Sequence, residues 1–195
     1  MTRSVTLLLA THNDHKRREF ARLLGADHQL HTLPPGVTLP PENAHTFAEN
    51  ALGKARAAAH ATRSITIADD SGIEAAALGG APGVRSARYA SAHASDEQNL
   101  AKLLREAPPG SALAYVCALA YVDPASGVEH VFEERCTGRM AASPSGPGGF
   151  GYDPAFLPDD GPHGLTMAEL SDAQKDAISH RGRAARALLA WLAAR

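Results

Sequence analysis

Two adjacent acids, Asp69 and Asp70, have the types and spacing that point most directly to chemistry. They follow a short β-branched run over residues 64–68, which predicts a strand that ends at the two acids, with Gly72 turning the chain after them. Carboxylates at the end of a buried strand suit Mg²⁺ coordination and the activation of a water molecule. Ordinary turns use the same residue types, so both interpretations stay open. Glu42, in a proline-rich loop that gives it no structural duty, is the preferred second metal ligand.

A second polar group follows the apolar run over residues 5–10, where a buried strand would turn into a helix. Its members are Thr11, His12, Asn13, Asp14, His15 and Lys16. Exposed backbone N–H groups, the helix dipole and the Lys16 ammonium would together favour a phosphate group there. A capped helix that begins with a solvated lysine explains the same residues without a ligand.

The glycine-rich segment 145–154 forms the third group. It satisfies G-x-G-x-x-G formally, but Pro154 disfavours the helix that a dinucleotide-binding fingerprint must open. A loop that displays Phe150 and Tyr152 instead suits the binding of an aromatic base, with backbone groups contacting the edge of that base. The alternative is that both rings pack in the hydrophobic core.

The fourth group, Lys175 with Ser179, His180 and Arg181, lies at the junction of two predicted C-terminal helices. Ser179 can cap the second helix. His180 and Arg181 then lie in its first turn, where positive charge opposes the helix dipole, so an anionic or hydrogen-bonding ligand would explain them. A solvated pair is the alternative. Together the four groups predict a Mg²⁺-assisted reaction on a phosphorylated ligand with an aromatic base.

The elements that position these groups follow from hydrophobic periodicity and capping signals. Thr46 and Glu49 form a capping box for an alanine-rich helix that places Asn50 and Lys54 on one face. Early alternation of strands and helices and a late hairpin predict an α/β fold with a long mixed sheet flanked by helices. Strands are expected over 5–10, 29–33, 64–68, 113–122 and 128–135, and helices over 14–24, 46–62, 95–107, 171–178 and 179–195. Residues 73–78 fit either a helix or a short strand.

Composition limits the classes of function. The chain has 195 residues, of which 44% are hydrophobic and 21% charged, as in a globular domain with a sizeable core. A net charge of -2 gives no basic excess for a nucleic-acid backbone, so we expect a small substrate and no nucleic acid. No apolar run approaches the roughly 18 residues of a membrane span, and no membrane partner is expected. Cys117 and Cys136 fit no metal spacing and are expected to be packing residues in a cytoplasmic protein.

Taken in order along the chain, these groups resemble the motifs of the inosine triphosphate pyrophosphatase family, also called the Ham1-like family. The matching segments are residues 10–13 with Lys16 and Glu19, 46–51 with Lys54 and Ala55, 68–72, 78–83, 86–89, 148–154, 168–170 and 175–182. They cover nearly the whole chain in register. The resemblance implies one bilobal domain over residues 1–195, with a central substrate cleft between two lobes, that forms a homodimer.

The resemblance also implies hydrolysis of ITP, dITP or XTP to the monophosphate and pyrophosphate, with Mg²⁺, or Mn²⁺ in its place, as the metal. Asp70 would bind the metal and accept a proton from the attacking water, and Glu42 would be a second metal ligand. Residues 11–16 would hold the triphosphate, and Lys16 and Lys54 would balance its charge. The implied nucleotide contacts are Ser71, Phe150, Gly151, Tyr152, Asp153, Lys175, His180 and Arg181.

Two departures and two alternatives remain at this point. His12 stands where the family commonly has glycine, and His15 stands where a small residue is frequent. A positive φ at His12 would strain the phosphate loop. The first alternative is a sensor that binds a nucleoside triphosphate without cleaving it. The second is a pyrophosphatase for modified pyrimidine or methylated nucleotides.

Overall fold

The computed structural model describes residues 4–25 and 28–195. These residues form two compact units. Unit 1 comprises the described part of Met1–Asp70 with Cys117–Glu134 and Arg181–Arg195, and unit 2 comprises Ser71–Val116 and Arg135–His180. The chain passes from one unit to the other within three strands and again at the start of the last helix.

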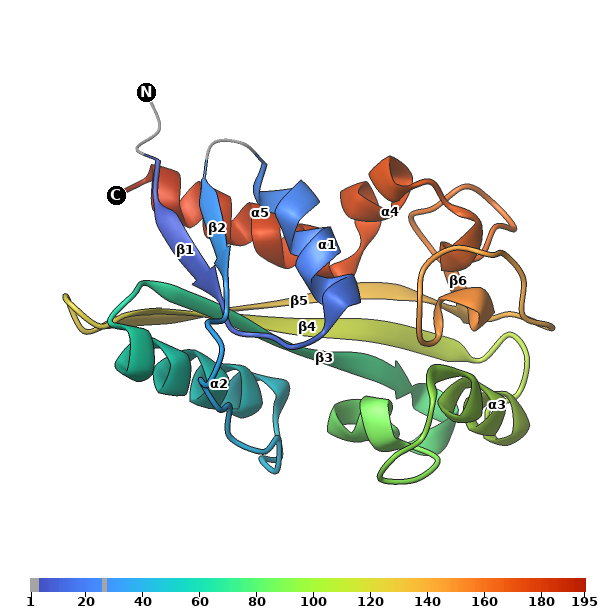
Figure 1. Ribbon diagram of the computed structural model, residues 1–195. Coiled ribbons are helices and arrows are strands. Elements are labelled where there is room, and N and C mark those ends of the chain that lie inside the picture. Colours follow the sequence, from blue (N-terminus) through green and yellow to red (C-terminus); the bar gives the residue numbers. More distant parts are fainter. Residues whose placement is uncertain (1–3, 26–27) are drawn as a thin grey trace. The chain divides into compact units, whose positions relative to one another are not determined.

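Six strands form one sheet in the order β2-β1-β3-β4-β5-β6 (Figure 1). Their bounds are β1 Thr6–Leu9, β2 Gln29–Thr32, β3 Thr66–Ala75, β4 Ala112–Asp123, β5 Val128–Met140 and β6 Phe156–Pro158. β1 is parallel to both β2 and β3, whereas β5 and β6 are antiparallel. Residues 124–127 join β4 to its neighbour β5, a connection short enough only for an antiparallel pair. The sheet is therefore mixed, which confirms the predicted α/β class.

The helices begin where the capping signals predict them. Asn13 caps the first helix, and Gly25 ends it with a φ of 65°. Thr46, Ser95 and Ser171 each form the predicted capping box. The α-helices are α1 Asp14–Leu24, α2 Phe47–Thr62, α3 Asp96–Glu106, α4 Asp172–Ile178 and α5 His180–Ala193, and the 3₁₀ turns are η1 Ala76–Leu78, η2 Gly83–Arg88, η3 Asp153–Ala155 and η4 Met167–Glu169.

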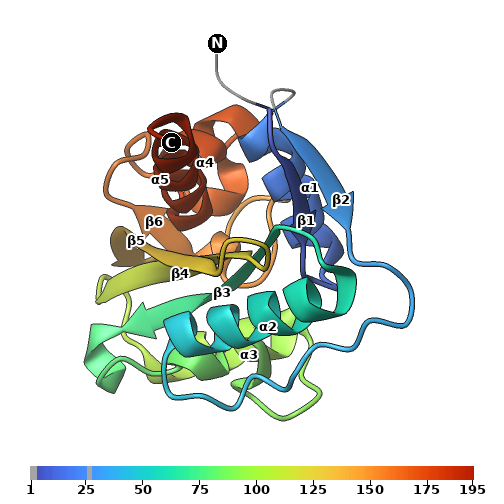
Figure 2. The same cartoon turned by 90° about the vertical axis from the view of Figure 1, so that its left-hand side faces the viewer.

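In unit 1, helices cover both faces of the sheet (Figures 1 and 2). α1 and α5 lie on one face, over a core that includes Leu7, Phe20 and Leu188. α2 lies on the other face and buries a row of small side chains that includes Ala51 and Ala55. Small residues at those positions let the helix approach the strands closely. The polar side chains of α2 on the same face are therefore brought near β3.

Unit 2 has a separate core of apolar side chains from the second half of the sheet, from α3 and from the segment between β5 and α4. The largest fully buried members include Ile73, Leu103, Phe156 and Met167. The ambiguous segment 73–78 is divided between the end of β3 and the turn η1.

β3 does not end at Asp69 and Asp70, as the sequence predicts, but continues past them. Gly72 therefore lies inside a strand and does not turn the chain. A Cβ at Gly72 would lie 2.4 Å from Ser86 Oγ and 2.6 Å from Gly83 O. Glycine is needed here because η2 lies so close to the strand, and this close approach leaves no local signal in the sequence.

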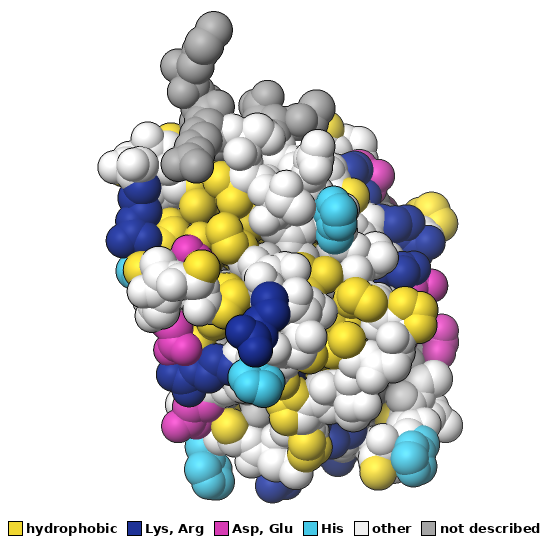
Figure 3. Space-filling model, turned by 60° about the vertical axis from the view of Figure 1, so that its left-hand side comes forward, with side chains coloured by type: hydrophobic (Ala, Val, Ile, Leu, Met, Phe, Trp, Pro, Cys, Tyr) yellow, Lys and Arg dark blue, Asp and Glu magenta, His cyan; other side chains and the backbone are white. Residues whose placement is uncertain are grey.

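The surface and the cysteines agree with the composition. Lysine and arginine side chains are interspersed with acidic and uncharged ones on the face drawn in Figure 3. Within the described residues, no helix combines the length and apolar character needed to cross a bilayer. Cys117 and Cys136 are buried free thiols, and burial raises the pKa of Cys117, so packing is their role as predicted.

Candidate functional site

The strand conformation of β3 separates the two adjacent acids. Because successive side chains of a strand point to opposite faces, Asp69 and Asp70 are directed to different helices. Asp69 Oδ2 lies 2.9 Å from Lys16 Nζ of α1 and 3.3 Å from Arg181 Nε of α5. Asp70 Oδ2 accepts a hydrogen bond from Asn50 Nδ2 of α2 at 2.9 Å. The two carboxylates therefore do not form one side-by-side pair, and the ordinary turn is also wrong because β3 continues past both acids.

Asp69 is the centre of a buried ion network. Its side chain is 0% exposed, and Arg181 links it to Glu19 through a bond of 2.9 Å from Nη1 to Oε2. Burial alone would raise the pKa of Asp69, but the charges of Lys16, Arg181 and Lys54 lower it well below the usual range. In turn, Glu19 and Asp69 outweigh burial and raise the pKa of Arg181. Asp69 therefore stays ionised and holds these cations in place.

Asp70 has the opposite electrostatic environment. Burial, reinforced by the charge of Glu42, raises its pKa, while Lys54, Lys16 and the hydrogen bond from Asn50 oppose that rise. A carboxylate with a raised pKa is a better proton acceptor than an ordinary exposed one. Asp70 is thus the acid in this group that is suited to exchange a proton.

Lys54 bonds to both segments that carry these acids, the loop of Glu42 and the strand β3. Its Nζ donates hydrogen bonds to Glu42 Oε1 and, at 2.6 Å, to the backbone oxygen of Asp69. Burial lowers the pKa of Lys54, but Asp69, Glu42 and Asp70 together raise it above the usual value. The lysine therefore remains a cation although its side chain is almost fully buried.

Glu42 and Asp70 fit the requirements of a magnesium ion. Mg²⁺ prefers hard oxygen ligands and is commonly held by one or two carboxylates, with water and substrate phosphates completing its shell. In residues 4–25 and 28–195, no three His, Cys, Asp or Glu side chains gather into a site that would hold a metal by protein ligands alone. Two carboxylates, Glu42 and Asp70, are thus the donors that this region offers to such an ion.

Residues 11–16, which are predicted to bind a phosphate, lead into the capped start of α1. Asn13 Oδ1 accepts from the N–H of Lys16 at 3.1 Å, and Thr11 Oγ1 accepts from the N–H of Asn13 at 3.2 Å. The Lys16 side chain is only 13% exposed, so the solvated lysine of the alternative interpretation is wrong. His12 is exposed. Among the described non-glycine residues only Arg63 has a positive φ, so the backbone strain considered for His12 does not occur.

The two remaining members of residues 11–16 lie at the surface. Asp14, in the first turn of α1, pairs with Arg17 at 2.6 Å. His15 Nδ1 lies 3.1 Å from Arg18 Nη2. Both side chains therefore lie on the outer face of α1.

A second group of predicted residues is brought together within unit 2, around Asp153. Its Oδ2 accepts from Lys175 Nζ at 2.7 Å and from the N–H of Phe150 at 2.9 Å, and its Oδ1 accepts from the hydroxyl of Tyr115 at 3.0 Å. Lys175 Nζ also lies 5.0 Å from the centre of the Phe150 ring. Asp153 therefore fixes both the lysine and the loop that carries the phenylalanine.

Tyr152 and His180 belong to the interior of unit 2. Tyr152 is buried in the core, its hydroxyl donates to Ser86 O at 2.7 Å, and burial raises its pKa. The core alternative is thus correct for this ring, which the loop does not display. His180 stacks on Tyr115 with ring centres 4.6 Å apart and planes 6° apart. Gly151 donates its N–H to Asp96 Oδ2 at 3.0 Å.

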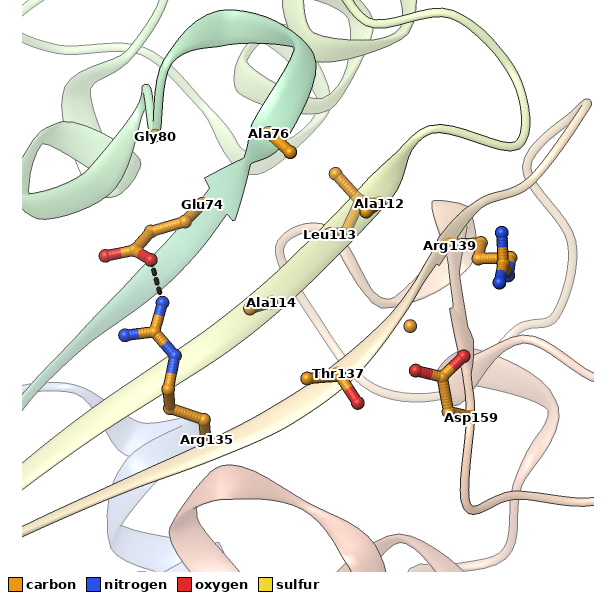
Figure 4. A pocket seen from close by; sticks show the side chains of 11 residues that line it. Glu74, Ala76, Gly80, Ala112, Leu113, Ala114, Arg135, Thr137, Arg139 and Asp159 are labelled. Carbon is orange, nitrogen blue, oxygen red and sulfur yellow. Dashed lines mark hydrogen bonds and ion pairs between the residues drawn. The ribbon is translucent and has the colours of Figure 1, made fainter.

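Unit 2 also contains an open pocket of about 350 Å³ on its sheet (Figure 4). Ala112 and Ala114 of β4 lie at its floor, and an ion pair between Glu74 and Arg135 lies at one end. None of the predicted site residues lines this pocket.

Sequence reasoning missed three functional partners. Glu19 has no role in the sequence analysis, although an acid beside Phe20 on the apolar side of α1 is a signal for a buried pair. Asp69 is not predicted as the counter-ion of Lys16. The hydrogen bond from Asn50 to Asp70 is not predicted either, although the shared helix face of Asn50 and Lys54 marks it as inward-facing.

Comparisons with known proteins place this geometry in context. The model of the Ham1 family matches residues 7–191. A dITP/XTP pyrophosphatase of Cutibacterium acnes is 44% identical over 195 residues, covering 94% of this chain and 94% of that protein. A dITP/XTP pyrophosphatase of Mycolicibacterium paratuberculosis is 46% identical over 198 residues, covering 94% of this chain and 93% of that protein.

Solved structures give the same result. A HAM1 protein from Coxiella burnetii matches with a TM-score of 0.87 at 34% identity, covering 98% of this chain and 100% of that one. A structure described as a nucleoside-triphosphatase or dITP/XTP pyrophosphatase from Mycobacterium abscessus matches with a TM-score of 0.73 at 42% identity, covering 94% of this chain and 98% of that one.

Proposed function

The chain belongs to the Ham1 family, and we propose that it hydrolyses non-standard purine nucleoside triphosphates, ITP, dITP and XTP, to the monophosphate and pyrophosphate. Two of its relatives, at 44% and 46% identity, are dITP/XTP pyrophosphatases. The reaction would remove deaminated purines from the nucleotide pool.

The environment of Asp70 carries this proposal. A buried carboxylate with a raised pKa, beside a second acid and a buried lysine, is suited to accept a proton from a water molecule. In the proposed mechanism Asp70 takes that proton as the water attacks the α-phosphorus in line with the leaving pyrophosphate. Asn50 donates to the same carboxylate and orients it.

Glu42 and Asp70 would hold the metal ion that the family implies. When bound, Mg²⁺ supplies positive charge that offsets the charge developing on the leaving pyrophosphate. Lys16 and Lys54 add two cations to the same region, and the network around Asp69 keeps both in position. The residues 11–16 then offer the start of α1 to the triphosphate.

The proposed nucleotide contacts are Ser71, Phe150, Gly151, Asp153, Lys175 and His180 of unit 2 and Arg181 of unit 1, whereas Tyr152 supports the loop from the core. Selectivity for the 6-oxo group of the base requires a donor that adenine, with its 6-amino donor, leaves unpaired. His180, Arg181 or a backbone N–H would supply that donor. An unpaired buried donor is costly enough to reject ATP strongly.

A substrate panel tests the proposal. The protein is incubated with Mg²⁺ and, separately, ITP, dITP, XTP, ATP, GTP and dTTP, and both pyrophosphate and orthophosphate are measured. We expect pyrophosphate from ITP, dITP and XTP and little product from ATP. Release of orthophosphate in its place would refute the proposed reaction.

The same panel decides between the alternatives. A nucleotide sensor would give saturable binding of ITP without pyrophosphate. A pyrophosphatase for modified pyrimidine or methylated nucleotides would leave ITP intact and cleave those substrates when they are added.

Three wider parts of the proposal concern the whole protein. We propose that residues 1–195 act as one bilobal domain, because the chain passes between the units within single strands. We propose a homodimer, which sedimentation would test. We propose a cytoplasmic location, which suits a substrate from the nucleotide pool and two buried free thiols. The proposed partner is a nucleoside triphosphate and not a nucleic acid.

A further inference from the structure

Asn50 is a buried polar residue inside a helix, where its side chain has no capping duty. It lies in the first turns of α2 and is 5% exposed. Asparagine is less favourable than alanine in a helix interior, so a buried asparagine there calls for a specific use of its amide. The structure shows two such uses, one through each end of the carboxamide.

The two ends of the Asn50 amide connect different segments of unit 1. Nδ2 donates to Asp70 Oδ2 at 2.9 Å, and Oδ1 accepts from the backbone N–H of Ala44 at 3.0 Å. A carboxylate can only accept and a backbone N–H can only donate, so the orientation of the amide is fixed by its two partners. Ala44 lies two residues after Glu42, which means that Asn50 ties the loop carrying Glu42 to the strand carrying Asp70.

Lys54 makes a second tie between the same segments. It lies one helical turn after Asn50 on the same face of α2. Its Nζ bonds to Glu42 Oε1 and to the backbone oxygen of Asp69. Asn50 therefore holds the backbone of the loop and the carboxylate of the strand, and Lys54 holds the carboxylate of the loop and the backbone of the strand.

α3 contains a close counterpart of Asn50. Asn99 is 2% exposed and also follows the fourth residue of a capping box, formed by Ser95 and Gln98. Its Oδ1 accepts from the N–H of Ala90 at 2.8 Å, and its Nδ2 donates to Ala87 O at 3.2 Å. Both asparagines thus bond to the segment before their helix. The difference is that the amide N–H₂ of Asn50 is directed to a carboxylate and that of Asn99 to a backbone carbonyl.

We propose that Asn50 is a positioning residue for divalent-metal binding, which orients the carboxylate of Asp70 and ties the loop that carries Glu42 to β3. This inference rests on the proposed function for its choice of metal ligands, Glu42 and Asp70. It adds that the placement of these ligands depends on the amide of Asn50, beside the tie made by Lys54, and is not a consequence of the fold of α2 alone.

The test measures metal binding directly. Free Mn²⁺ is followed by electron paramagnetic resonance as it is titrated into the nucleotide-free full-length protein. Asn50→Leu keeps the approximate volume of the side chain and removes both hydrogen bonds. We expect it to weaken Mn²⁺ binding by about 10-fold to 100-fold, the usual effect of losing a partner that orients a metal ligand. Asn99→Leu likewise removes one accepted and one donated hydrogen bond, both to backbone groups, and should bind Mn²⁺ as the wild-type protein does.

The control separates positioning from general destabilisation. Thermal unfolding of both variants is measured, and if either leucine variant fails to fold, Asn50→Ala and Asn99→Ala replace the pair. Mn²⁺ affinity of the Asn50 variant equal to that of the wild type, or an equal loss in the Asn99 variant, overturns the inference. The proposed reaction fails on a different result, the absence of pyrophosphate from ITP, so the two failures are distinguishable.

Discussion

Asp69 and Asp70 are chain neighbours whose side chains lie on opposite faces of β3. The cations around Asp69 lower its pKa, whereas burial and the charge of Glu42 raise the pKa of Asp70. One carboxylate therefore holds buried cations in place, and the other is suited to exchange a proton. Substituting each acid in turn should separate stability from catalysis.

Asp70→Asn is expected to lower kcat for ITP by about 10²-fold to 10⁴-fold, the usual contribution of a general base. The same variant should be more stable than the wild type at neutral pH. The raised pKa means that the folded state disfavours the ionised carboxylate, so wild-type stability is lost as pH rises through that pKa. Unfolding in urea at several pH values measures this gain, which should vanish below about pH 4. Turnover near the wild-type rate would refute the assignment of Asp70.

Asp69→Asn is expected to destabilise the fold by about 3–5 kcal/mol at pH 7, because it leaves the buried cations Lys16 and Arg181 without this counter-ion. The lowered pKa of Asp69 gives stability that is present above its unfolded pKa and lost as pH falls below about 4. The difference between variant and wild type should therefore shrink in acid.

The matched control for Asp69 is the exposed pair between Arg56 and Glu129. Glu129→Gln should cost about 0–1 kcal/mol, as surface ion pairs do. A loss in Asp69→Asn no larger than that of Glu129→Gln would contradict the network described around Asp69.

At the scale of elements, caps are predicted well because they are local. Asn13, Thr46, Ser95 and Ser171 begin their helices where the sequence indicates, since each bond joins residues three apart in the chain. The end of β3 is predicted wrongly because acids and glycine are also turn residues. The contact that explains Gly72 comes from η2. That segment lies too far along the chain to be visible in the local sequence pattern around Gly72.

Gly72→Ala tests the close approach of β3 and η2. The added methyl group would lie 2.4 Å from Ser86 Oγ, so we expect a loss of about 1–3 kcal/mol from overpacking. Gly53→Ala in α2 is the control, because its Cβ would meet only Pro40 Cγ at 4.0 Å. That change should stabilise the protein by about 0.5–1 kcal/mol. Chemical denaturation of both variants decides, and equal effects would argue against a packing role for Gly72.

The site could be predicted in part. Polar groups at strand ends and helix starts select Lys16, Asp70 and Lys175 as candidates from the sequence alone, and the structure gives each of them a charged or polar partner. Their partners could not be predicted, because Glu19 pairs with Arg181 and Lys175 pairs with Asp153 across long chain separations. Both Asp69 and Asp70 are buried, and the cations around each decide whether its pKa is lowered or raised.

At the scale of the whole molecule, the predicted site residues fall into two groups, one within each unit. Unit 1 holds the acids and lysines around β3, and unit 2 holds the group around Asp153. Both groups lie within residues 7–191, the part of the chain that matches the Ham1 family. Catalysis of the full reaction is therefore expected of the complete chain.

Hydrolysis of ITP in ¹⁸O-labelled water is the most direct measurement of the central claim, that a water prepared by Asp70 attacks the α-phosphorus. With Mg²⁺ present, mass spectrometry should find the label in inosine monophosphate and none in pyrophosphate, and the Asp70→Asn protein should yield neither product at a comparable rate. Label in pyrophosphate, or unlabelled monophosphate, would contradict the account.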